Sequence, residues 1–386
     1  MQYELTEEQK MLRTAVRELA EEQVKPGAHE RDEKEEFSWE IVNLLRDSGF
    51  LTPDLPAEYG GGDMGMLSER IIIEELSRVE LSTGLLVSEQ ILGALPIMLA
   101  GSKELKDKFL PKLSTGEHLS AFALTEPSGG SDVAGFTCRA ERRGDEYIVN
   151  GNKTFITNGS VADIVTAYVV TNPEKGSHRG ASVLAIPTKG TPGFSVGKHE
   201  IKLGIRASDT AELVFDDMHV PLENLCGEEG QGFAIMMKTL DFTRPTIGAQ
   251  ALGTAQGAFD DALAYAKERV VFGVPIIQHE ALAFKLVDML IGIEAARQLL
   301  YKACAILQEC PKDMTRLTPE QVRWSSMCKT FASDVAMNVT TEAVQVLGGY
   351  GYCRDYPMEI RMRDAKITQI YEGTNEIQRL VIARTL

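Results

Sequence analysis

Glu372 is the carboxylate whose sequence surroundings most favour chemistry. It follows Ile370 and Tyr371 and precedes Gly373. Apolar neighbours remove water from a carboxylate, which raises its pKa towards neutrality. Such a group can abstract a weakly acidic C–H proton in a dry site. We therefore predict that Glu372 is a general base; the alternative is an exposed glutamate in a turn.

Two glycine-containing segments can bring backbone groups close to a ligand. Residues 122–132 read FALTEPSGGSD, a strand that runs into a glycine-rich loop with free N–H groups and hydroxyls. Residues 345–351 read QVLGGYG, in which adjacent glycines leave the backbone uncovered by side chains. An ordinary β-turn loop is the alternative for the first segment.

The elements that must position these residues follow the order helices, strands, helices. Thr6 and Gln9 have capping-box spacing, and helical periodicity continues to Leu99, where Pro96 is expected to kink or restart the last helix. From residue 118 to 221 the apolar runs are short and β-branched, and Gly144-Asp145 and Asn150-Gly151 have the composition of hairpin turns. This pattern predicts an antiparallel β region. After residue 227 the helical period returns, with apolar faces wide enough for a bundle or a subunit interface.

Composition excludes several classes of protein. A net charge of −16 argues against nucleic acid as a partner. No apolar run reaches the roughly 18 residues that span a bilayer. The N-terminus has the features of neither a secretory signal nor a transit peptide. We expect a cytoplasmic protein, or a mature form without its targeting segment.

The cysteines suit a reducing compartment. The six thiols include no CxxC pair, so we expect neither a zinc site nor a disulfide framework, and no metal site is predicted. Buried structural cysteines are the preferred interpretation, with a catalytic thiol as the alternative. The residues concerned are Cys138, Cys226, Cys304, Cys310, Cys328 and Cys353.

Together these motifs resemble those of the acyl-CoA dehydrogenase family, from the N-terminal helix to Arg384. The resemblance implies an α+β, multi-domain fold. It has an N-terminal helical domain (residues 1–115), a middle antiparallel β domain (residues 116–226) and a C-terminal four-helix bundle (residues 227–386). It also implies FAD as the cofactor and an acyl-CoA as the substrate.

The resemblance also assigns the cofactor contacts. Phe155 would pack on the flavin, and Thr157 would donate a hydrogen bond near its N5 edge, which stabilises charge on the reduced ring. Arg269 would reach the pyrophosphate of a neighbouring subunit's cofactor. Val271 and Glu280 depart from the residues that are usual in the family, which weakens individual FAD contacts. Neither is therefore included among the expected cofactor residues. The implied set is Phe122, Leu124, Thr125, Phe155, Thr157, Arg269, Phe272, Gln345, Gly348, Gly349, Thr374 and Glu376.

For the substrate, the resemblance implies contacts from Ser131, Asp241, Arg244 and Gly373. Glu372 would take the α-proton while the β-hydride passes to FAD N5 on the opposite face, which gives a trans-2-enoyl-CoA. Some family branches place their base at the position of Thr243. That position has no carboxylate here, so Glu372 is the base expected among the family's usual positions.

The acyl group is less well defined. Glu89 and Ile91 are unusual in a helix that forms part of the family's acyl pocket floor. A carboxylate facing the pocket would disfavour a simple long alkyl chain and could act as a second acid or base on an unusual acyl group such as a ring. Alternatively, Glu89 faces solvent or pairs with an arginine. We expect a short- to medium-chain or alicyclic acyl group.

The resemblance further implies electron transfer to an electron-transfer flavoprotein and a homotetramer built as a dimer of dimers. Three alternatives stay open. The same scaffold can run in reverse as an enoyl-CoA reductase, or serve as a catalytically silent assembly subunit. An acyl-CoA oxidase is less favoured, because the larger oxidases have an additional C-terminal domain.

Overall fold

The N-terminal part is helical, and local caps set where its helices begin. The computed structural model describes residues 4–386, with the side chains of residues 134 and 177 excepted. Thr6 accepts a hydrogen bond from the backbone N–H of Gln9, and the Gln9 side chain accepts one from the Thr6 N–H, which confirms the capping box. The elements are α1 (Glu7–Leu19), a π-helical turn (Ala20–Val24), α2 (Lys25–Lys34), α3 (Trp39–Asp47), a 3₁₀ turn (Ala57–Tyr59), α4 (Met66–Val79), α5 (Leu81–Ala100) and α6 (Lys103–Ser114).

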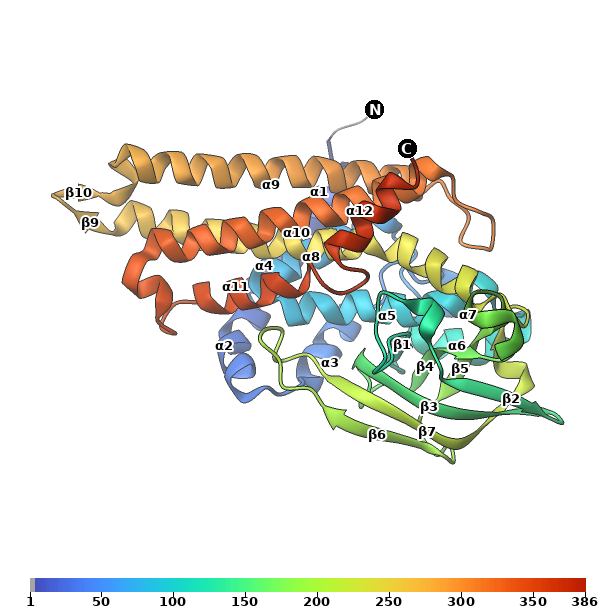
Figure 1. Cartoon of the computed structure of the whole chain (residues 1–386). Coiled ribbons are helices and arrows are strands. Elements are labelled where there is room, and N and C mark those ends of the chain that lie inside the picture. Colours follow the sequence, from blue (N-terminus) through green and yellow to red (C-terminus); the bar gives the residue numbers. More distant parts are fainter. Residues whose placement is uncertain (1–3) are drawn as a thin grey trace.

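Helix α5 forms the centre of the molecule. It packs against β1 (Ser120–Ala123) and against α8 (Gly232–Glu268), so it separates the sheet from the C-terminal helices (Figure 1). Gly93 permits the approach to β1, because a Cβ there would lie 2.5 Å from Ser120 Oγ. The helix runs through Pro96 without a break, so the expected restart is wrong. Packing on all sides offsets the one hydrogen bond that a proline cannot donate.

Helix α5 is also long and apolar enough to cross a membrane, although Glu89 interrupts its apolar run. Its apolar window is 94% buried inside the protein. We therefore assign α5 as a core helix, in which any polar side chain needs a partner.

The middle part is one eight-stranded sheet. Its order is β6-β7-β3-β2-β4-β5-β8, with β1 beside β4. Most neighbours are antiparallel, as predicted, but β1 and β2 each pair with β4 in parallel, which the sequence did not indicate. The strands after β1 are β2 (Arg139–Arg143), β3 (Glu146–Thr157), β4 (Ile164–Val170), β5 (Ala181–Pro187), β6 (Phe194–His199), β7 (Thr210–Pro221) and β8 (Leu225–Cys226).

Only one of the two predicted hairpin turns forms. Gly144-Asp145 does connect β2 to β3. Asn150-Gly151 instead lies inside β3, where the register against β7 shifts between Val149 and Gly151. The prediction of a turn at Asn150-Gly151 is wrong, because glycine within a strand can also mark a bulge.

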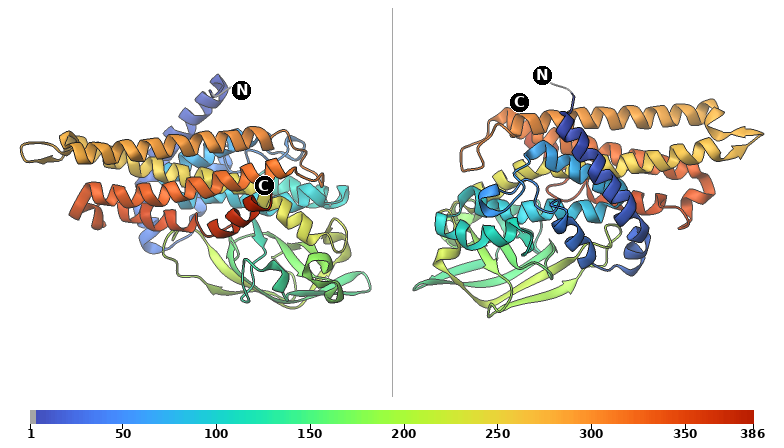
Figure 2. Two further views of the ribbon diagram at one scale, coloured as in Figure 1. Left: turned by 45° about the horizontal axis from the view of Figure 1, so that its top comes forward. Right: turned by 180° about the vertical axis from the view of Figure 1, so that it is seen from behind.

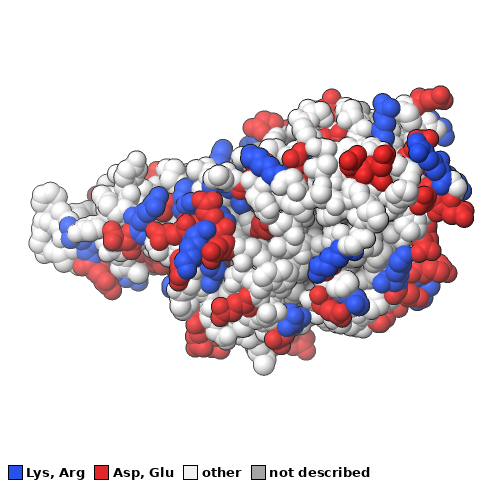
Figure 3. All heavy atoms as spheres, turned by 90° about the horizontal axis from the view of Figure 1, so that it is seen from below, with Lys and Arg blue, Asp and Glu red and all other residues white. Residues whose placement is uncertain are grey.

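In the C-terminal part three long helices lie side by side, and two shorter helices pack against the last of them (Figures 1 and 2). A short hairpin, β9 (Val270–Val271) and β10 (Val274–Pro275), projects from one end of them. Seen from below, this projecting end carries few charged side chains (Figure 3). The helices are α8 (Gly232–Glu268), α9 (Glu280–Leu307), α10 (Pro319–Leu347), α11 (Met358–Ile367) and α12 (Asn375–Ala383).

The cysteines are free, and four of the six are buried as expected. Cys310 is partly buried and Cys353 is exposed, so the expectation of buried cysteines fails for Cys353. Cys353 directly follows Tyr352, the last residue of the 3₁₀ turn between α10 and α11, a position that the sequence did not identify as surface.

Candidate active site

Glu372 lies in the loop between α11 and α12, and neighbouring helices hold this loop in place. Glu372 and Gly373 both have positive φ angles, 50° and 90°. A non-glycine residue in this region is strained by roughly 1–3 kcal/mol, so its surroundings must hold it. Gln378 Nε2 donates to the carbonyl oxygens of Glu372 and Gly373, at 3.0 and 2.9 Å. Lys329 Nζ donates to the same Gly373 oxygen at 2.9 Å.

The Glu372 carboxyl faces α8. Thr243 Oγ1 donates a hydrogen bond to Glu372 Oε2 at 2.8 Å. The residue as a whole is only partly buried, but lost solvation at the carboxyl raises its pKa to about 7, against the opposing effects of Thr243, Arg244 and Lys329. A carboxylate with a pKa close to the working pH suits proton abstraction. Thr243, which was expected only to lack a competing carboxylate, contacts the Glu372 carboxyl directly.

Replacing Thr243 with valine tests this contact. Thr243 stabilises the charged form of Glu372, so its loss should raise the pKa of Glu372 by about one unit, the equivalent of one charge-assisted hydrogen bond. The midpoint of the pH dependence of kcat/KM should move up accordingly. Thr340→Val is the matched control, because Thr340 Oγ1 donates only within its own helix, to the Ala336 and Met337 carbonyls. An unmoved midpoint in Thr243→Val would rule out the contact.

Pro245 explains the unusual contacts of the neighbouring α8 segment. A proline has no N–H, so it leaves the carbonyl of Asp241 without its helical donor, and Ser325 Oγ donates to that oxygen at 2.6 Å. Arg244 forms an ion pair with the Asp241 carboxylate and is itself buried. Its Nε has no hydrogen-bond partner among the described residues. Asp241 and Arg244 therefore lie together on the helix that carries Thr243, and Arg244 retains an unused donor.

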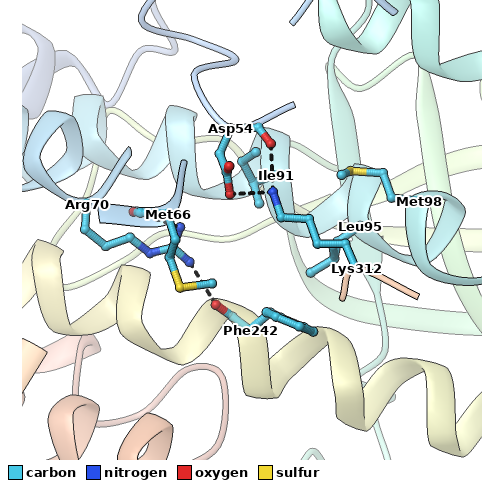
Figure 4. Close-up of a pocket in the computed structure, with 8 residues that line it drawn as sticks. All are labelled: Asp54, Met66, Arg70, Ile91, Leu95, Met98, Phe242 and Lys312. Carbon is cyan, nitrogen blue, oxygen red and sulfur yellow. Dashed lines mark hydrogen bonds and ion pairs between the residues drawn. The ribbon is translucent and has the colours of Figure 1, made fainter. Parts of the chain in front are cut away.

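A cluster of charged side chains packs against α8 at Phe242. Arg70 Nη2 donates to the Phe242 carbonyl at 2.8 Å, and Arg70 is ion-paired with Glu69. Figure 4 shows Arg70 near the Asp54–Lys312 ion pair, around a small pocket lined with apolar side chains of α5. The apolar lining residues are Met66, Ile91, Leu95, Met98 and Phe242. Sequence reasoning missed this cluster, although Glu69-Arg70 stands directly before an Ile-Ile-Ile run.

Glu89 is buried, with 3% of its surface exposed. Its Oε1 accepts the backbone N–H of Phe122 at 2.9 Å. Burial raises the pKa of Glu89 well above its usual range, and the charge of Glu372 adds to this effect. The alternatives of a solvent-facing or arginine-paired Glu89 are therefore wrong.

The segments expected to contact the flavin meet where β1 and β3 end. Thr154 N donates to the Thr125 carbonyl at 2.9 Å, and the buried Lys153 pairs with Glu126 at 2.8 Å. These contacts hold Phe122, Leu124 and Thr125 next to the end of β3, which carries Phe155 and Thr157. Phe155 has a positive φ of 58° and is 63% exposed. Ser131 is exposed and lies in the loop that follows Thr125.

A second expected cluster lies at the projecting end of the helices. The guanidinium of Arg269 stacks 5.7 Å from the ring centroid of Tyr350, in the turn that contains Gly348 and Gly349. Both glycines have open space where a Cβ would stand. Phe272 is 93% exposed and Gln345 is exposed. The described chain does not bring this cluster to the first one (Figure 1).

Two further residues of the expected cofactor set, Thr374 and Glu376, lie next to Glu372. Thr374 caps α12 by accepting the Ile377 N–H, and Glu376 is exposed in the first turn. Gly373 contributes its carbonyl to Lys329 and Gln378. Residues 373–376 therefore adjoin the carboxyl-bearing residue Glu372 and place the start of α12 beside it.

Sequence reasoning missed two sets of supporting residues. Lys329 is buried in α10, and burial lowers its pKa to about 7; a lysine within an apolar helix face is the signal that could have identified it. The hydroxyl of Tyr371 donates to Gln250, and Gln250 Nε2 donates to Ser88 Oγ at 2.7 Å. This chain of side chains links the loop of Glu372 to α8 and α5.

Comparisons with known proteins agree in all parts of the chain. Models of the acyl-CoA dehydrogenase N-terminal, middle and C-terminal domains match residues 6–117, 121–218 and 230–386. The chain is 48% identical over 384 residues to cyclohex-1-ene-1-carbonyl-CoA dehydrogenase of Geobacter metallireducens, which covers 99% of this chain and 98% of that protein.

Solved structures give the same result. Butyryl-CoA dehydrogenase from Megasphaera elsdenii superposes with a TM-score of 0.94 at 42% identity, over 100% of this chain and 99% of that chain. A chain in a structure described as the electron transferring flavoprotein of Acidaminococcus fermentans has a TM-score of 0.95 at 45% identity, over 100% and 99% of the two chains.

Proposed function

This chain belongs to the acyl-CoA dehydrogenase family, and we propose that it oxidises a short-chain or alicyclic acyl-CoA at the α,β bond with Glu372 as the base. Family membership makes it a FAD-dependent oxidoreductase. The observation that carries the proposal is the desolvated Glu372 carboxyl, whose pKa is raised to about 7. Thr243 donates to this carboxyl, and Lys329 holds the loop that carries it. Such a carboxylate matches the weakly acidic α-proton of a thioester.

The residues near Glu372 fit this chemistry. Bound FAD supplies an acceptor for the β-hydride. Glu372 takes the α-proton on its carboxylate, which Thr243 orients. The backbone N–H of Glu372 makes no hydrogen bond to any residue from 4 to 386, so it is available to polarise the thioester carbonyl. Gln378 and Lys329 hold the loop in position for both tasks.

The residues at the ends of β1 and β3 fit a flavin ring. An aromatic side chain that is 63% exposed in a strained conformation is costly unless a flat apolar ligand covers it. Phe155 meets that description, with Thr157 as a hydroxyl donor two residues further along. The Arg269 cluster fits a phosphate, because it combines a guanidinium with open glycine backbone.

Because the two clusters lie apart in one chain, we propose that a second copy completes the cofactor site and that the enzyme is a homotetramer, a dimer of dimers. The exposed apolar side chains of α9 and the projecting hairpin support this proposal, since monomers rarely expose such surfaces. These side chains are Val270, Phe272, Phe284, Val287, Leu290 and Ile291.

Size-exclusion chromatography with light scattering tests the assembly. We expect FAD to elute only with the tetramer. Phe284→Asp together with Ile291→Asp should give smaller species that lose FAD, because a charge buried in an apolar interface is costly. Exposed Glu309→Gln is the control. A monomer that retains a full complement of FAD would contradict the proposal.

We infer a short or cyclic acyl group from the polar side chains on the segments around Glu372. The linked side chains of Ser88, Gln250 and Tyr371 join α5, α8 and the Glu372 loop, and the buried Glu89 is the next residue on α5. Polar groups beside an acyl site disfavour a long alkyl chain. Relatives described as acting on cyclohexene-carbonyl-CoA and butyryl-CoA have such small acyl groups. We propose an electron-transfer flavoprotein as the electron acceptor, which the Acidaminococcus structure supports.

Anaerobic titration of the purified yellow protein tests the proposed activity. A panel of straight-chain, branched, cyclic and dicarboxylic acyl-CoA thioesters is added, and the visible flavin absorbance is followed. We expect bleaching by the short-chain and alicyclic members and little by long-chain ones. If no member of the panel bleached the flavin, the proposed activity would be wrong and a silent assembly role would take its place.

A further inference from the structure

The Glu89 carboxyl is not used in the mechanism above. It lies on α5, almost fully buried, and one of its oxygens accepts the Phe122 N–H on the strand expected to contact the flavin. The other oxygen makes no hydrogen bond within residues 4–386. Ser88, the preceding residue on α5, accepts a hydrogen bond from Gln250, and Gln250 accepts one from Tyr371, the residue before Glu372. These hydrogen bonds therefore join the two segments that carry the carboxyl groups of Glu89 and Glu372, α5 and the α11–α12 loop.

A purely structural role does not require an ionisable group here. A glutamine would accept the Phe122 N–H equally well through its amide oxygen. Burying a carboxyl beside a second one instead incurs desolvation and like-charge repulsion. Two neighbouring carboxyl groups with raised proton affinities are typical of sites in which each transfers a proton.

We propose that Glu89 is a second proton acceptor, which removes a γ-proton from an alicyclic thioester whose α,β bond is already double. This inference rests on the proposed function, because it uses the same acyl site and the same hydride acceptor. Such a substrate has no α-proton, so Glu372 has nothing to abstract. Its acidic hydrogens are those on the γ carbon, where the carbonyl acts through the double bond.

The bond changes balance without any additional reagent. In a six-membered ring the carbon that bears the thioester has two β carbons, one of them in the double bond and the other saturated. Glu89 takes H⁺ from the γ carbon, and the electrons of that C–H bond form a new double bond to the unsaturated β carbon. The original double-bond electrons shift to form a bond between the α carbon and the saturated β carbon, from which hydride leaves. The product is a conjugated cyclic diene.

This arrangement changes the proton acceptor and leaves the hydride acceptor in place. In both reactions hydride departs from a β carbon, to FAD as in the family reaction. Only the proton comes from a different carbon, so a second base displaced from Glu372 is what the chemistry needs. Glu89, on α5 beside Phe122, provides such a base.

Solvent-deuterium exchange measured by mass spectrometry separates the two bases without relying on turnover. The holoenzyme is incubated anaerobically in D₂O with cyclohex-1-ene-1-carbonyl-CoA, to follow γ-exchange, and with cyclohexanecarbonyl-CoA, to follow α-exchange. Glu89→Gln should lower γ-exchange on the order of 10²-fold relative to α-exchange. Glu372→Gln should show the opposite pattern. Glu309→Gln, an exposed control, should change neither.

The outcomes distinguish this inference from the proposed function. Glu89→Asp keeps a carboxyl and should retain more γ-exchange than Glu89→Gln, a difference that a folding defect does not produce. Flavin absorbance verifies that each variant holds FAD. Gamma-exchange in Glu89→Gln within about twofold of wild type, far below the loss expected of a base, would overturn the inference. So would α-exchange without γ-exchange in the wild type. Absence of both exchanges and of bleaching would overturn the proposed function as well.

Discussion

Glu372→Gln is expected to lower kcat by at least about 10³-fold, because the amide cannot accept the α-proton and general-base catalysis contributes up to about 10⁴-fold. Glutamine has nearly the same shape and can still accept the Thr243 hydrogen bond. The backbone contacts of the loop from Gln378 and Lys329 do not involve the carboxyl. FAD content and acyl-CoA binding should therefore stay close to those of the wild type. Steady-state turnover with an artificial electron acceptor measures the loss.

The exposed Glu309→Gln variant is the control for general effects of a lost charge. If Glu372→Gln kept more than about a tenth of wild-type turnover on a saturated thioester, a loss too small for a missing general base, the base would lie elsewhere. Glu89 would then be the first residue to test. Loss of FAD together with turnover would instead indicate damage to the site.

The second large effect concerns stability. Arg70→Met should destabilise the protein by roughly 3–5 kcal/mol, because it leaves the fully buried Glu69 without its partner. The Phe242 carbonyl also loses the Arg70 hydrogen bond. Both side chains of the ion pair are almost inaccessible to solvent, at 2% and 0% exposure. The midpoint of urea unfolding, compared at equal FAD saturation, measures the change.

Two further variants make this result specific. Arg46→Met removes an exposed arginine and should change stability by less than about 0.5 kcal/mol. Glu69→Gln combined with Arg70→Met removes both charges and should recover part of the lost stability. Equal midpoints for wild type and Arg70→Met would show that the buried pair contributes nothing.

The features that the sequence predicted well depend on local spacing. The Thr6–Gln9 capping box and the Gly144-Asp145 hairpin turn each involve residues within three positions of each other. No distant part of the chain is needed to form them. The order of helical and strand parts follows from periodicity in the same way. Asn150-Gly151 shows the limit, because the same pair suits a turn or a bulge, and only the pairing of β3 with β7 decides between them.

The features that could not be predicted depend on contacts between distant elements. Glu89 looks like any helical glutamate until β1 is seen to supply the Phe122 N–H and to exclude water. Thr243 and Lys329 reach the Glu372 loop across more than forty positions in the sequence. The candidate base itself was predictable because its motif is contiguous. Its pKa was predictable only in direction.

The pH dependence of flavin bleaching in the wild-type enzyme is the most direct test of the central claim. At low acyl-CoA concentration, the second-order rate constant for anaerobic bleaching reports on the protonation of the free enzyme. Glu372 must be deprotonated to act as the base, and its pKa is raised to about 7. We predict that the rate constant rises with pH, with a midpoint near 7, and is level above it. A rate constant that is independent of pH across neutrality, or that falls as pH rises through it, would contradict Glu372 as the base.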